Sequence, residues 1–146
     1  MVKYTRTYEE LPRGLSKMFK KIEPSIATSV KKHPRGRRTR YIVAYNGKDE
    51  PRGILEWSHR CARHFGRHNM PFLANMDTSV HHRGYGELLF NQFLSEIKYR
   101  FFLFCMDENA EQFWRHIGEK NGLTITTPFK SPWGTPALLM KKRKPL

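Results

Sequence analysis

A Gly-x-Gly stretch at residues 81–86, His-His-Arg-Gly-Tyr-Gly, stands between an apolar segment of strand length and an amphipathic segment of helical period. The backbone N–H groups at a helix N-terminus have no intrahelical partner, and the helix dipole favours an anion there. Gly84 and Gly86 let a ligand approach the backbone closely, and Arg83 adds a cation beside them. The stretch therefore predicts a cradle for a pyrophosphate, while a tight strand-to-helix turn without a ligand stays open as the alternative.

The spacing of these glycines argues against two common nucleotide sites. The stretch lacks the Gly-x-Gly-x-x-Gly pattern of dinucleotide-binding domains, and no Gly-Lys-Ser/Thr follows it as in a phosphate-binding loop.

Two carboxylates stand where a proton acceptor could act. Asp77 directly follows the apolar segment 72–76, so it is a candidate general base, acting directly or through water; the alternative is an ordinary turn residue. Glu56 lies inside the apolar sequence Gly-Ile-Leu-Glu-Trp and is a second candidate base with a raised pKa. The alternative for Glu56 is a side chain that faces solvent on a half-exposed strand.

Residues 59–69 are basic and rich in histidine. His64 and His68 are four residues apart, a spacing that places two metal ligands on one helix face, and His59 and Cys61 are nearby. No carboxylate completes such a set, and the arginines of the segment repel cations, so we expect no metal. We expect the segment to line an acceptor cleft instead.

The charge of the chain is strongly positive. Its 146 residues include 27 Lys and Arg against 13 Asp and Glu, a formal net charge of +14. Such a field favours a polyanionic partner such as nucleic acid, and it exceeds what solubility needs. The expected contacts lie in two basic segments: Lys31, Lys32, Arg35, Arg37, Arg38, Arg60, Arg63 and Arg67.

Hydrophobic periodicity and turn residues give the expected elements. Residues 5–21 are predicted to be helical in part, and residues 59–69 to form a loop or short helical excursion. Helices are expected where Leu89, Phe93 and Ile97 recur and at 110–117, the latter capped by Asp107 or Asn109 and stopped by Gly118 and Gly122. The expected strands are 41–45, 53–57, 72–76, 100–106, 123–127 and 137–140, with a hairpin between the first two.

This order predicts an α/β (α+β) domain with one mixed, mostly antiparallel sheet flanked by helices. We expect residues 1–146 to form a single domain with a basic loop at 31–40 and a basic tail at 141–146. No apolar run could span a bilayer and no signal peptide is evident, so we expect no membrane partner and a cytoplasmic location. Two cysteines in different contexts predict no disulfide framework, and Cys105 is expected to be buried.

The glycine stretch resembles the acyl-CoA signature of the GNAT acetyltransferases, Gln/Arg-x-x-Gly-x-Gly/Ala. The signature falls on His81, Gly84 and Gly86, and His81 departs from it. A second match runs from Asn109 to Gly118 and resembles the helix after the family's fifth strand, with Ala110 two positions earlier than usual.

The resemblance implies acetyl-CoA or another acyl-CoA as cofactor, with its pantetheine arm between segments 72–76 and 100–106 and direct attack of an amine on the thioester. The family's usual acid is a Tyr at the position of Trp114, whose indole cannot donate a proton in that role. The implied catalytic residues are therefore Asp77, Glu56 and Tyr85, the last as acid unless water takes that part. The implied cofactor-binding residues are Ala74, Asn75, Met76, His81, His82, Arg83, Gly84, Tyr85, Gly86, Asn109 and Phe113.

The expected function is N-acyl transfer from acyl-CoA to an amine on or near a nucleic acid, such as aminoacyl-tRNA or a DNA base. Two alternatives stay open. One is a catalytically inactive GNAT-fold protein that binds nucleic acid or has a structural role, as in a phage or mobile element. The other is a protein or small-amine acetyltransferase. A homodimer also stays open.

Overall fold

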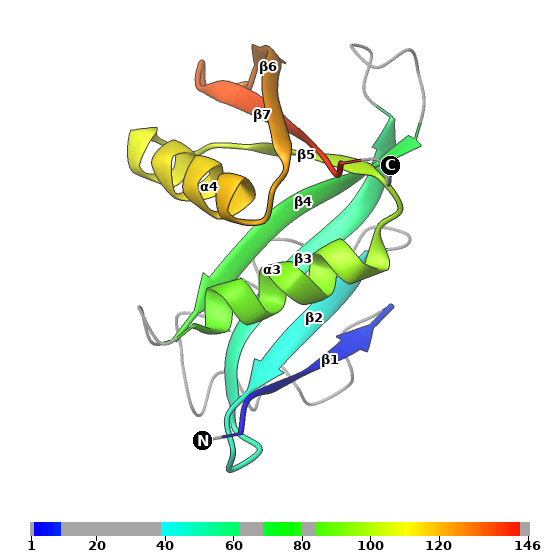
Figure 1. Cartoon of the computed structure of the whole chain (residues 1–146), viewed down its shortest axis with the longest axis vertical. Coiled ribbons are helices and arrows are strands. Elements are labelled where there is room, and N and C mark those ends of the chain that lie inside the picture. The colour runs from blue at the N-terminus through cyan, green and yellow to red at the C-terminus, as the bar shows by residue number, and fades with distance from the viewer. Residues whose placement is uncertain (1, 10–38, 62–68, 80–83, 144–146) are drawn as a thin grey trace. The chain divides into compact units, whose positions relative to one another are not determined.

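The computed structural model describes residues 2–9, 39–61, 69–79 and 84–143 (Figure 1). This part of the chain forms one sheet with the strand order β1-β2-β3-β4-β5-β7-β6, in which β4 and β5 run parallel and the other recorded pairs run antiparallel. The predicted α/β class with a mixed, mostly antiparallel sheet is confirmed. The elements are β1 Tyr4–Tyr8, β2 Arg40–Tyr45, β3 Pro51–Cys61, β4 Asn69–Thr78, α3 Tyr85–Glu96, β5 Arg100–Phe104, α4 Glu108–Lys120, β6 Thr124–Lys130 and β7 Pro136–Lys141.

The chain divides into two compact units, each described by itself below. Unit 1 comprises Met1–Ser58 and Asn75–Glu96, and unit 2 comprises His59–Ala74 and Ile97–Leu146. Strands β3 and β4 contribute to both units. The expectation of a single domain over residues 1–146 stays a prediction.

In unit 1, α3 packs against one face of the sheet formed by β1, β2 and β3. The α3 side chains Leu89, Phe90 and Phe93 are fully buried, and the Phe93 ring meets the edge of Trp57 at a centroid distance of 5.5 Å. The Thr5 hydroxyl donates to the Gln92 side chain at 3.3 Å, which ties the helix to β1. The predicted period of buried residues in this helix is therefore confirmed.

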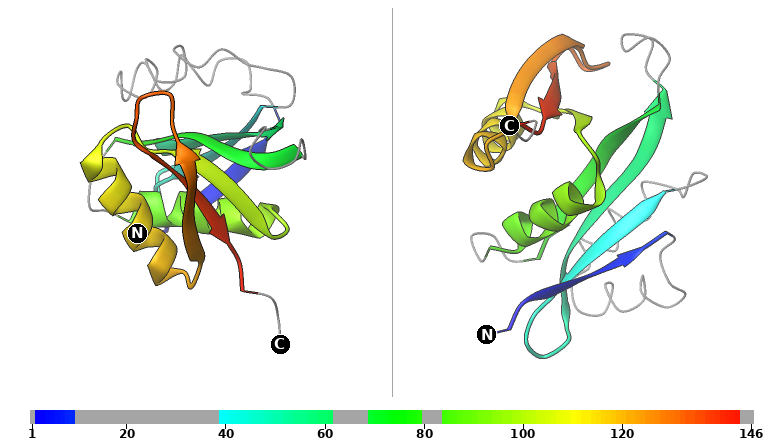
Figure 2. Two further views of the ribbon diagram at one scale, coloured as in Figure 1. Left: turned by 90° about the horizontal axis from the view of Figure 1, so that it is seen from above. Right: turned by 45° about the vertical axis from the view of Figure 1, so that its right-hand side comes forward.

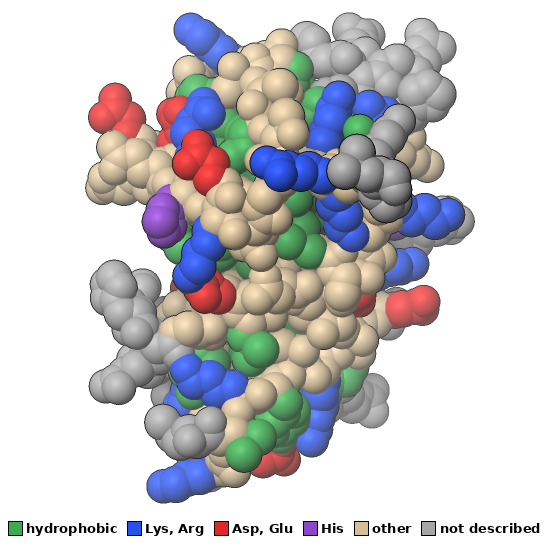
Figure 3. All heavy atoms as spheres, viewed as in Figure 1, with side chains coloured by type: hydrophobic (Ala, Val, Ile, Leu, Met, Phe, Trp, Pro, Cys, Tyr) green, Lys and Arg blue, Asp and Glu red, His purple; other side chains and the backbone are tan. Residues whose placement is uncertain are grey.

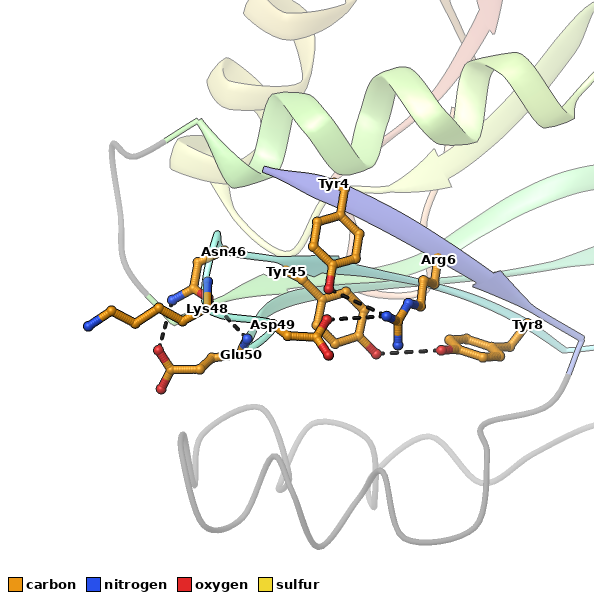
Figure 4. Close-up of polar contacts among 8 residues, drawn as sticks. All are labelled: Tyr4, Arg6, Tyr8, Tyr45, Asn46, Lys48, Asp49 and Glu50. Atoms are coloured by element: carbon orange, nitrogen blue, oxygen red, sulfur yellow. Dashed lines mark hydrogen bonds and ion pairs between the residues drawn. The ribbon is translucent and has the colours of Figure 1, made fainter. Parts of the chain in front are cut away.

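The opposite face of unit 1 carries a cluster of tyrosines (Figure 4). Tyr4 stacks on Tyr45 at a centroid distance of 5.2 Å, and the hydroxyls of Tyr8 and Tyr45 are 3.5 Å apart. The Arg6 guanidinium lies over both stacked rings and pairs with Asp49 at 3.2 Å. Burial and the Tyr8 hydroxyl raise the pKa of Tyr45 to about 12, so its hydroxyl stays protonated at neutral pH.

Strand β1 corrects the helix expected at residues 5–21. Tyr4–Tyr8 pairs with β2 along its whole length, from Tyr4 opposite Tyr45 to Tyr8 opposite Tyr41. Tyr4, Arg6 and Tyr8 alternate with two threonines, so both tyrosines fall on one face, which is the period of a strand. Residues 10–21 lie outside the described residues. The predicted hairpin between residues 41–45 and 53–57 is confirmed, with a turn in which the Asn46 side chain accepts from the Lys48 and Glu50 amides.

In unit 2, α4 packs on the sheet formed by β5, β7 and β6 (Figure 2). Asp107 caps the helix by accepting from the Ala110 amide at 2.7 Å, which selects it over Asn109 as the cap. The chain leaves the helix through Gly122 at φ +72°, a conformation that favours glycine. Cys105, just after β5, is fully buried as predicted.

Gly118 corrects a second expectation, because it lies inside α4 instead of stopping it. A Cβ at Gly118 would lie 2.9 Å from Ile125 Cδ1 and 3.0 Å from Met140 Sδ. The glycine therefore lets α4 approach β6 and β7 closely. Residues 59–61 also differ from the expected loop, since they complete β3, while 62–68 lie outside the described residues.

Candidate functional site

The backbone is exposed at Gly84, the residue that precedes α3. Gly84 is exposed at φ +80°, and its carbonyl accepts the first helical hydrogen bond, from the Leu88 amide at 3.1 Å. Among the described residues, the atom that a Cβ at Gly84 would approach within 4 Å is the Lys3 Nζ, at 3.4 Å. Because the amides of the first turn have no helical acceptor, this end of α3 presents N–H donors beside a left-handed glycine. His81, His82 and Arg83 lie outside the described residues.

A lysine that the sequence did not single out lies at this end of the helix. The Lys3 ammonium is 4.5 Å from the centroid of the Tyr85 ring, and it would lie 3.4 Å from a Cβ on Gly84. Its charge adds to the positive end of the α3 dipole. The residues present therefore fit an anionic group such as a pyrophosphate. The first-turn amides of α3, the exposed Gly84 and the Lys3 ammonium all lie at the N-terminus of this helix.

The end of β4, which precedes the glycine stretch in sequence, is held firmly. Ser79 donates to the Arg52 carbonyl from its amide at 2.8 Å and from its hydroxyl at 3.1 Å. Gly53 of β3 is packed so closely that a Cβ there would lie 3.0 Å from Leu89 Cδ1 and 3.1 Å from Thr78 Cγ2. The strands and α3 therefore approach one another through Gly53, and this fixes the end of β4.

The two candidate carboxylates share one face of unit 1. Trp57 and Thr78 point toward α3, as their contacts with Phe93 and with the Gly53 position show. Side chains alternate along a strand, so Glu56 and Asp77 point to the opposite face. The cradle at α3 and the two carboxylates thus lie on opposite sides of the same sheet.

Glu56 is buried, with 7% of its surface exposed, and stands opposite Tyr41 in the register of β2 and β3. This burial contradicts the alternative in which Glu56 faces solvent. Asp77 is half-buried near the end of β4. Tyr85 is buried at 4% exposure, with its ring beneath Lys3 on the α3 side.

The remaining predicted cofactor residues divide between the units. Asn75 and Met76 are half-buried in the part of β4 that belongs to unit 1, and Ala74 is half-buried in unit 2. Asn109 and Phe113 are exposed on α4, also in unit 2, so their predicted part in a ligand site with α3 stays a prediction. Trp114, at the position of the expected acid, is buried and meets Phe113 edge-to-face at 5.1 Å, as expected of a packed aromatic.

Cys105 offers no reactive thiol near neutral pH. Burial raises the pKa of its thiol to about 11, and the carboxylates of Glu111 and Asp107 act in the same direction against Arg115. A thiol that stays protonated is a poor nucleophile, so the group does not favour a covalent intermediate on this cysteine.

Of the predicted nucleic-acid contacts, Arg60 is described. It is exposed in β3, and its guanidinium lies 4.3 Å from the centroid of the Phe72 ring. The other contacts, and His64 and His68, lie outside the described residues: Lys31, Lys32, Arg35, Arg37, Arg38, Arg63 and Arg67. In the part of the chain that the structure describes, no His, Cys, Asp and Glu side chains gather in threes as metal ligands, and no helix is long and apolar enough to cross a bilayer.

No family model matches the sequence, and no curated protein matches it by sequence. Solved structures match its fold over almost the whole chain. An aminoglycoside N(6')-acetyltransferase from Legionella pneumophila is 15% identical, with a TM-score of 0.59, covering 97% of this chain and 92% of that one. A Desulfovibrio desulfuricans protein assigned as an acetyltransferase of the GNAT family is 11% identical, with a TM-score of 0.59, covering 94% and 98%. A mutant AtaT toxin, solved with the C-terminus of the antitoxin AtaR and acetyl-CoA, is 14% identical, with a TM-score of 0.56, covering 95% and 92%.

The chain has the GNAT fold. The structure therefore confirms the fold that the glycine stretch and the segment from Asn109 to Gly118 led us to expect. Two residues beside the start of α3 escaped sequence reasoning. Lys3 lies far from the glycine turn in sequence, and nothing in its neighbours marks it. Gly53 was read as the start of a strand, although a glycine inside a strand is itself a signal of close packing.

Proposed function

We propose that this protein is an acyl-CoA-dependent N-acyltransferase that holds the pyrophosphate of its cofactor at the start of α3. The observation that carries the proposal is the exposed left-handed Gly84 beside Lys3 at a helix N-terminus, in a GNAT fold. One structural neighbour, the AtaT toxin, was solved with acetyl-CoA, which supports the same class of cofactor here. Acetyl-CoA or another acyl-CoA would supply the activated acyl group as a thioester.

The arrangement in unit 1 supports a mechanism in which groups on opposite faces of the sheet accept the amine's proton and donate a proton to the thiolate. Asp77 and Glu56 lie on the face opposite the cradle, where one of them would accept the proton that the attacking amine loses. Tyr85 lies on the α3 side next to the cradle, and this tyrosine or a water molecule would donate the proton that the leaving thiolate takes up. The new bond joins the amine nitrogen to the acyl carbon, and the bond that breaks joins that carbon to sulfur.

We propose a nucleic acid as the carrier of the acceptor amine. The support is the formal net charge of +14 and the Lys and Arg side chains spread over the face shown in Figure 3, where Asp and Glu are fewer. The second candidate is a GNAT-fold protein that binds without turnover, and the burial of Trp114 at the usual acid position favours it. The third alternative, a protein or small-amine acetyltransferase, makes no use of this charge.

The cradle can be tested by binding of acetyl-CoA, measured by calorimetry on Gly84→Val and Gly122→Val. Both glycines have positive φ, and among the described residues a new Cβ would meet at most the flexible end of Lys3, so both variants strain the backbone alike. Gly84→Val should weaken binding by tenfold or more, since one lost hydrogen bond to a charged group costs about 1.5–3 kcal/mol. Gly122→Val should bind as the wild type does.

Thermal melting of both variants separates a lost site from a lost fold, because the two should melt at similar temperatures. The proposal of an acyl-CoA site at α3 fails if the wild type binds no acyl-CoA at millimolar concentration. It also fails if the two variants weaken binding equally.

A further inference from the structure

The sheet of unit 2 has two contrasting faces. Ile125 and Met140 lie on the face that packs against α4, as their contacts with the Gly118 position show. Cross-strand partners share a face and neighbours along a strand alternate. Phe102, Leu139 and Thr126, which are aligned in register, therefore lie on the face away from α4.

Aromatic rings gather on this second face, which we call the aromatic face. Phe72 and Phe102 pack at a centroid distance of 4.8 Å, and Phe104 meets Phe72 edge-to-face at 5.2 Å. Phe129 and Trp133 each meet Phe104 edge-to-face at 6.1 Å. The aromatic face thus consists of Phe72, Phe102, Phe104, Phe129 and Trp133, and it runs from buried rings at β4 to accessible rings at the β6–β7 turn.

Trp133 is exposed although the turn that carries it is firmly held. Its side chain is 59% exposed. The Ser131 amide donates to the Thr135 carbonyl at 2.6 Å, the Trp133 amide donates to the Ser131 hydroxyl at 3.3 Å, and the Thr135 hydroxyl donates to the Cys105 carbonyl. Core packing does not account for an exposed indole on a firmly held turn, and a turn that is already ordered loses little entropy when a planar ligand stacks on its indole.

The aromatic face is bordered by cations. Arg60 lies over Phe72, and Arg100 and Lys141 are register partners at the other end of β5 and β7. Within unit 2, the positions that register and contacts assign to this face include no Asp or Glu: Arg60, Met70, Phe72, Ala74, Arg100, Phe102, Phe104, Thr124, Thr126, Phe129, Ala137, Leu139 and Lys141. The ligand that this border complements is an anion.

We propose that the aromatic face of unit 2 binds single-stranded nucleic acid. Unpaired bases stack on Trp133 and on the accessible rings of Phe104 and Phe129, and phosphates contact Arg60 and the pair Arg100 and Lys141. Rings and cations together match a strand with exposed bases and a charged backbone, because every base has a face to stack and every linkage carries a charge. A duplex offers the charges without the base faces. The inference rests on the proposed function only in taking the bound strand as the carrier of the acceptor amine.

The experiment is fluorescence anisotropy of a labelled twelve-residue oligothymidine, with the full chain and no acyl-CoA present. Loss of one stacking partner costs about 1–3 kcal/mol, so Trp133→Ala should weaken binding about 5- to 150-fold. Trp133→Phe keeps a ring and should recover most of the affinity. If Trp133→Ala binds as the wild type does, or Trp133→Phe is as weak as Trp133→Ala, the proposal is overturned.

Charge is tested with Arg60→Ala against Lys48→Ala. Both variants remove one positive charge from an exposed position, and Lys48 lies in the β2–β3 turn of unit 1. Each phosphate contact to a single strand contributes about 0.7 to the slope of log affinity against log salt. Arg60→Ala should lower that slope by about 0.7 and Lys48→Ala should leave it unchanged. Equal effects would show general electrostatic attraction and overturn the assignment of this face.

A duplex of the same length is the third arm. It should bind more weakly than the single strand and without dependence on Trp133; a duplex that binds as tightly as the single strand overturns the proposal. Because these measurements omit acyl-CoA, they separate the two proposals. Failure here leaves calorimetric binding at Gly84 intact, and failure of the Gly84 test leaves strand binding intact.

Discussion

At the scale of single residues, the candidate site depends on which face each side chain takes. Glu56 and Asp77 share the face of unit 1 opposite α3, while Tyr85 lies on the α3 side. The proposed transfer would use both sets of groups: one carboxylate would accept the proton that the amine loses, and Tyr85 or water would donate the proton that the sulfur gains.

The assignment predicts unequal losses of turnover in Asp77→Asn, Glu56→Gln and Tyr85→Phe. A general acid or base contributes about 10²- to 10⁴-fold in rate. We expect one of the two carboxylate variants to lose that much in kcat at saturating acyl-CoA, with its affinity for acyl-CoA kept, while the other falls far less. The measurement is steady-state transfer to an amine together with calorimetric binding of acetyl-CoA.

Tyr85→Phe separates the tyrosine from water as the proton donor. If the hydroxyl donates, kcat falls by a similar factor; if water donates, kcat stays near the wild-type value. Near-wild-type turnover in all three variants would remove the catalytic assignment. A wild type that binds acyl-CoA but acylates no amine would establish the second candidate function.

At the scale of elements, the fold could largely be predicted from hydrophobic period and turn residues. The hairpin of β2 and β3 was marked by β-branched and aromatic residues around Asn46, and α3 by its buried four-residue period. Strand β1 was missed because a short segment next to Pro and Gly looks like a broken helix, and its partner β2 lies more than thirty residues away. Because the two strands are so far apart in sequence, the local signal for β1 is limited to the alternation of Tyr4, Arg6 and Tyr8 with two threonines.

The candidate site was less accessible to sequence reasoning than the fold. The glycine stretch is a local pattern that sequence can indicate, whereas Lys3 lies beside Tyr85 only through the packing of distant segments within unit 1. The aromatic face was also missed, because its rings come from four separate segments and only the register of β4 to β7 aligns them. Glycines were ambiguous: Gly122 ends a helix, but Gly118 lies within one.

The close approach of α4 to the sheet predicts the effect of a larger side chain at Gly118. A β-branched residue there would overlap Ile125 and Met140, and overpacking typically costs about 1–3 kcal/mol. We therefore expect Gly118→Val to lower the free energy of unfolding by that amount, measured by denaturant titration.

Glu119→Val is the matched control, since it places the same side chain on the next, exposed residue of α4. It should cost less than about 1 kcal/mol, the range of helix propensity. If the two variants lose equal stability, the close contact at Gly118 is not what stabilises this packing.

At the scale of the whole molecule, the net charge and the aromatic face would contribute differently to nucleic-acid binding. The net charge of +14 supplies long-range attraction to any polyanion, which salt screens. Attraction of that kind does not distinguish a single strand from a duplex. Discrimination has to come from short-range contacts, and the aromatic face and its bordering cations offer such contacts. Such a protein would attract any nucleic acid through its charge but would bind single strands more tightly than duplexes.

The tyrosine cluster on unit 1 sets an alkaline limit to the stability of the protein. Burial and the Tyr8 hydroxyl raise the folded pKa of Tyr45 to about 12, whereas the ordinary value, which applies to the unfolded chain, is 10.0. The folded state favours the protonated phenol, so this contribution is complete below pH 10 and is lost as the pH rises toward 12. Strand β1 rests on Tyr45 through the Tyr4 stack and the Arg6 guanidinium, so base should detach this edge strand first. Hydrogen exchange within β1, compared at pH 9 and at pH 11 after correction for the intrinsic rate, should show protection lost earlier there than in the β5–β7 ladder, and simultaneous loss would contradict it.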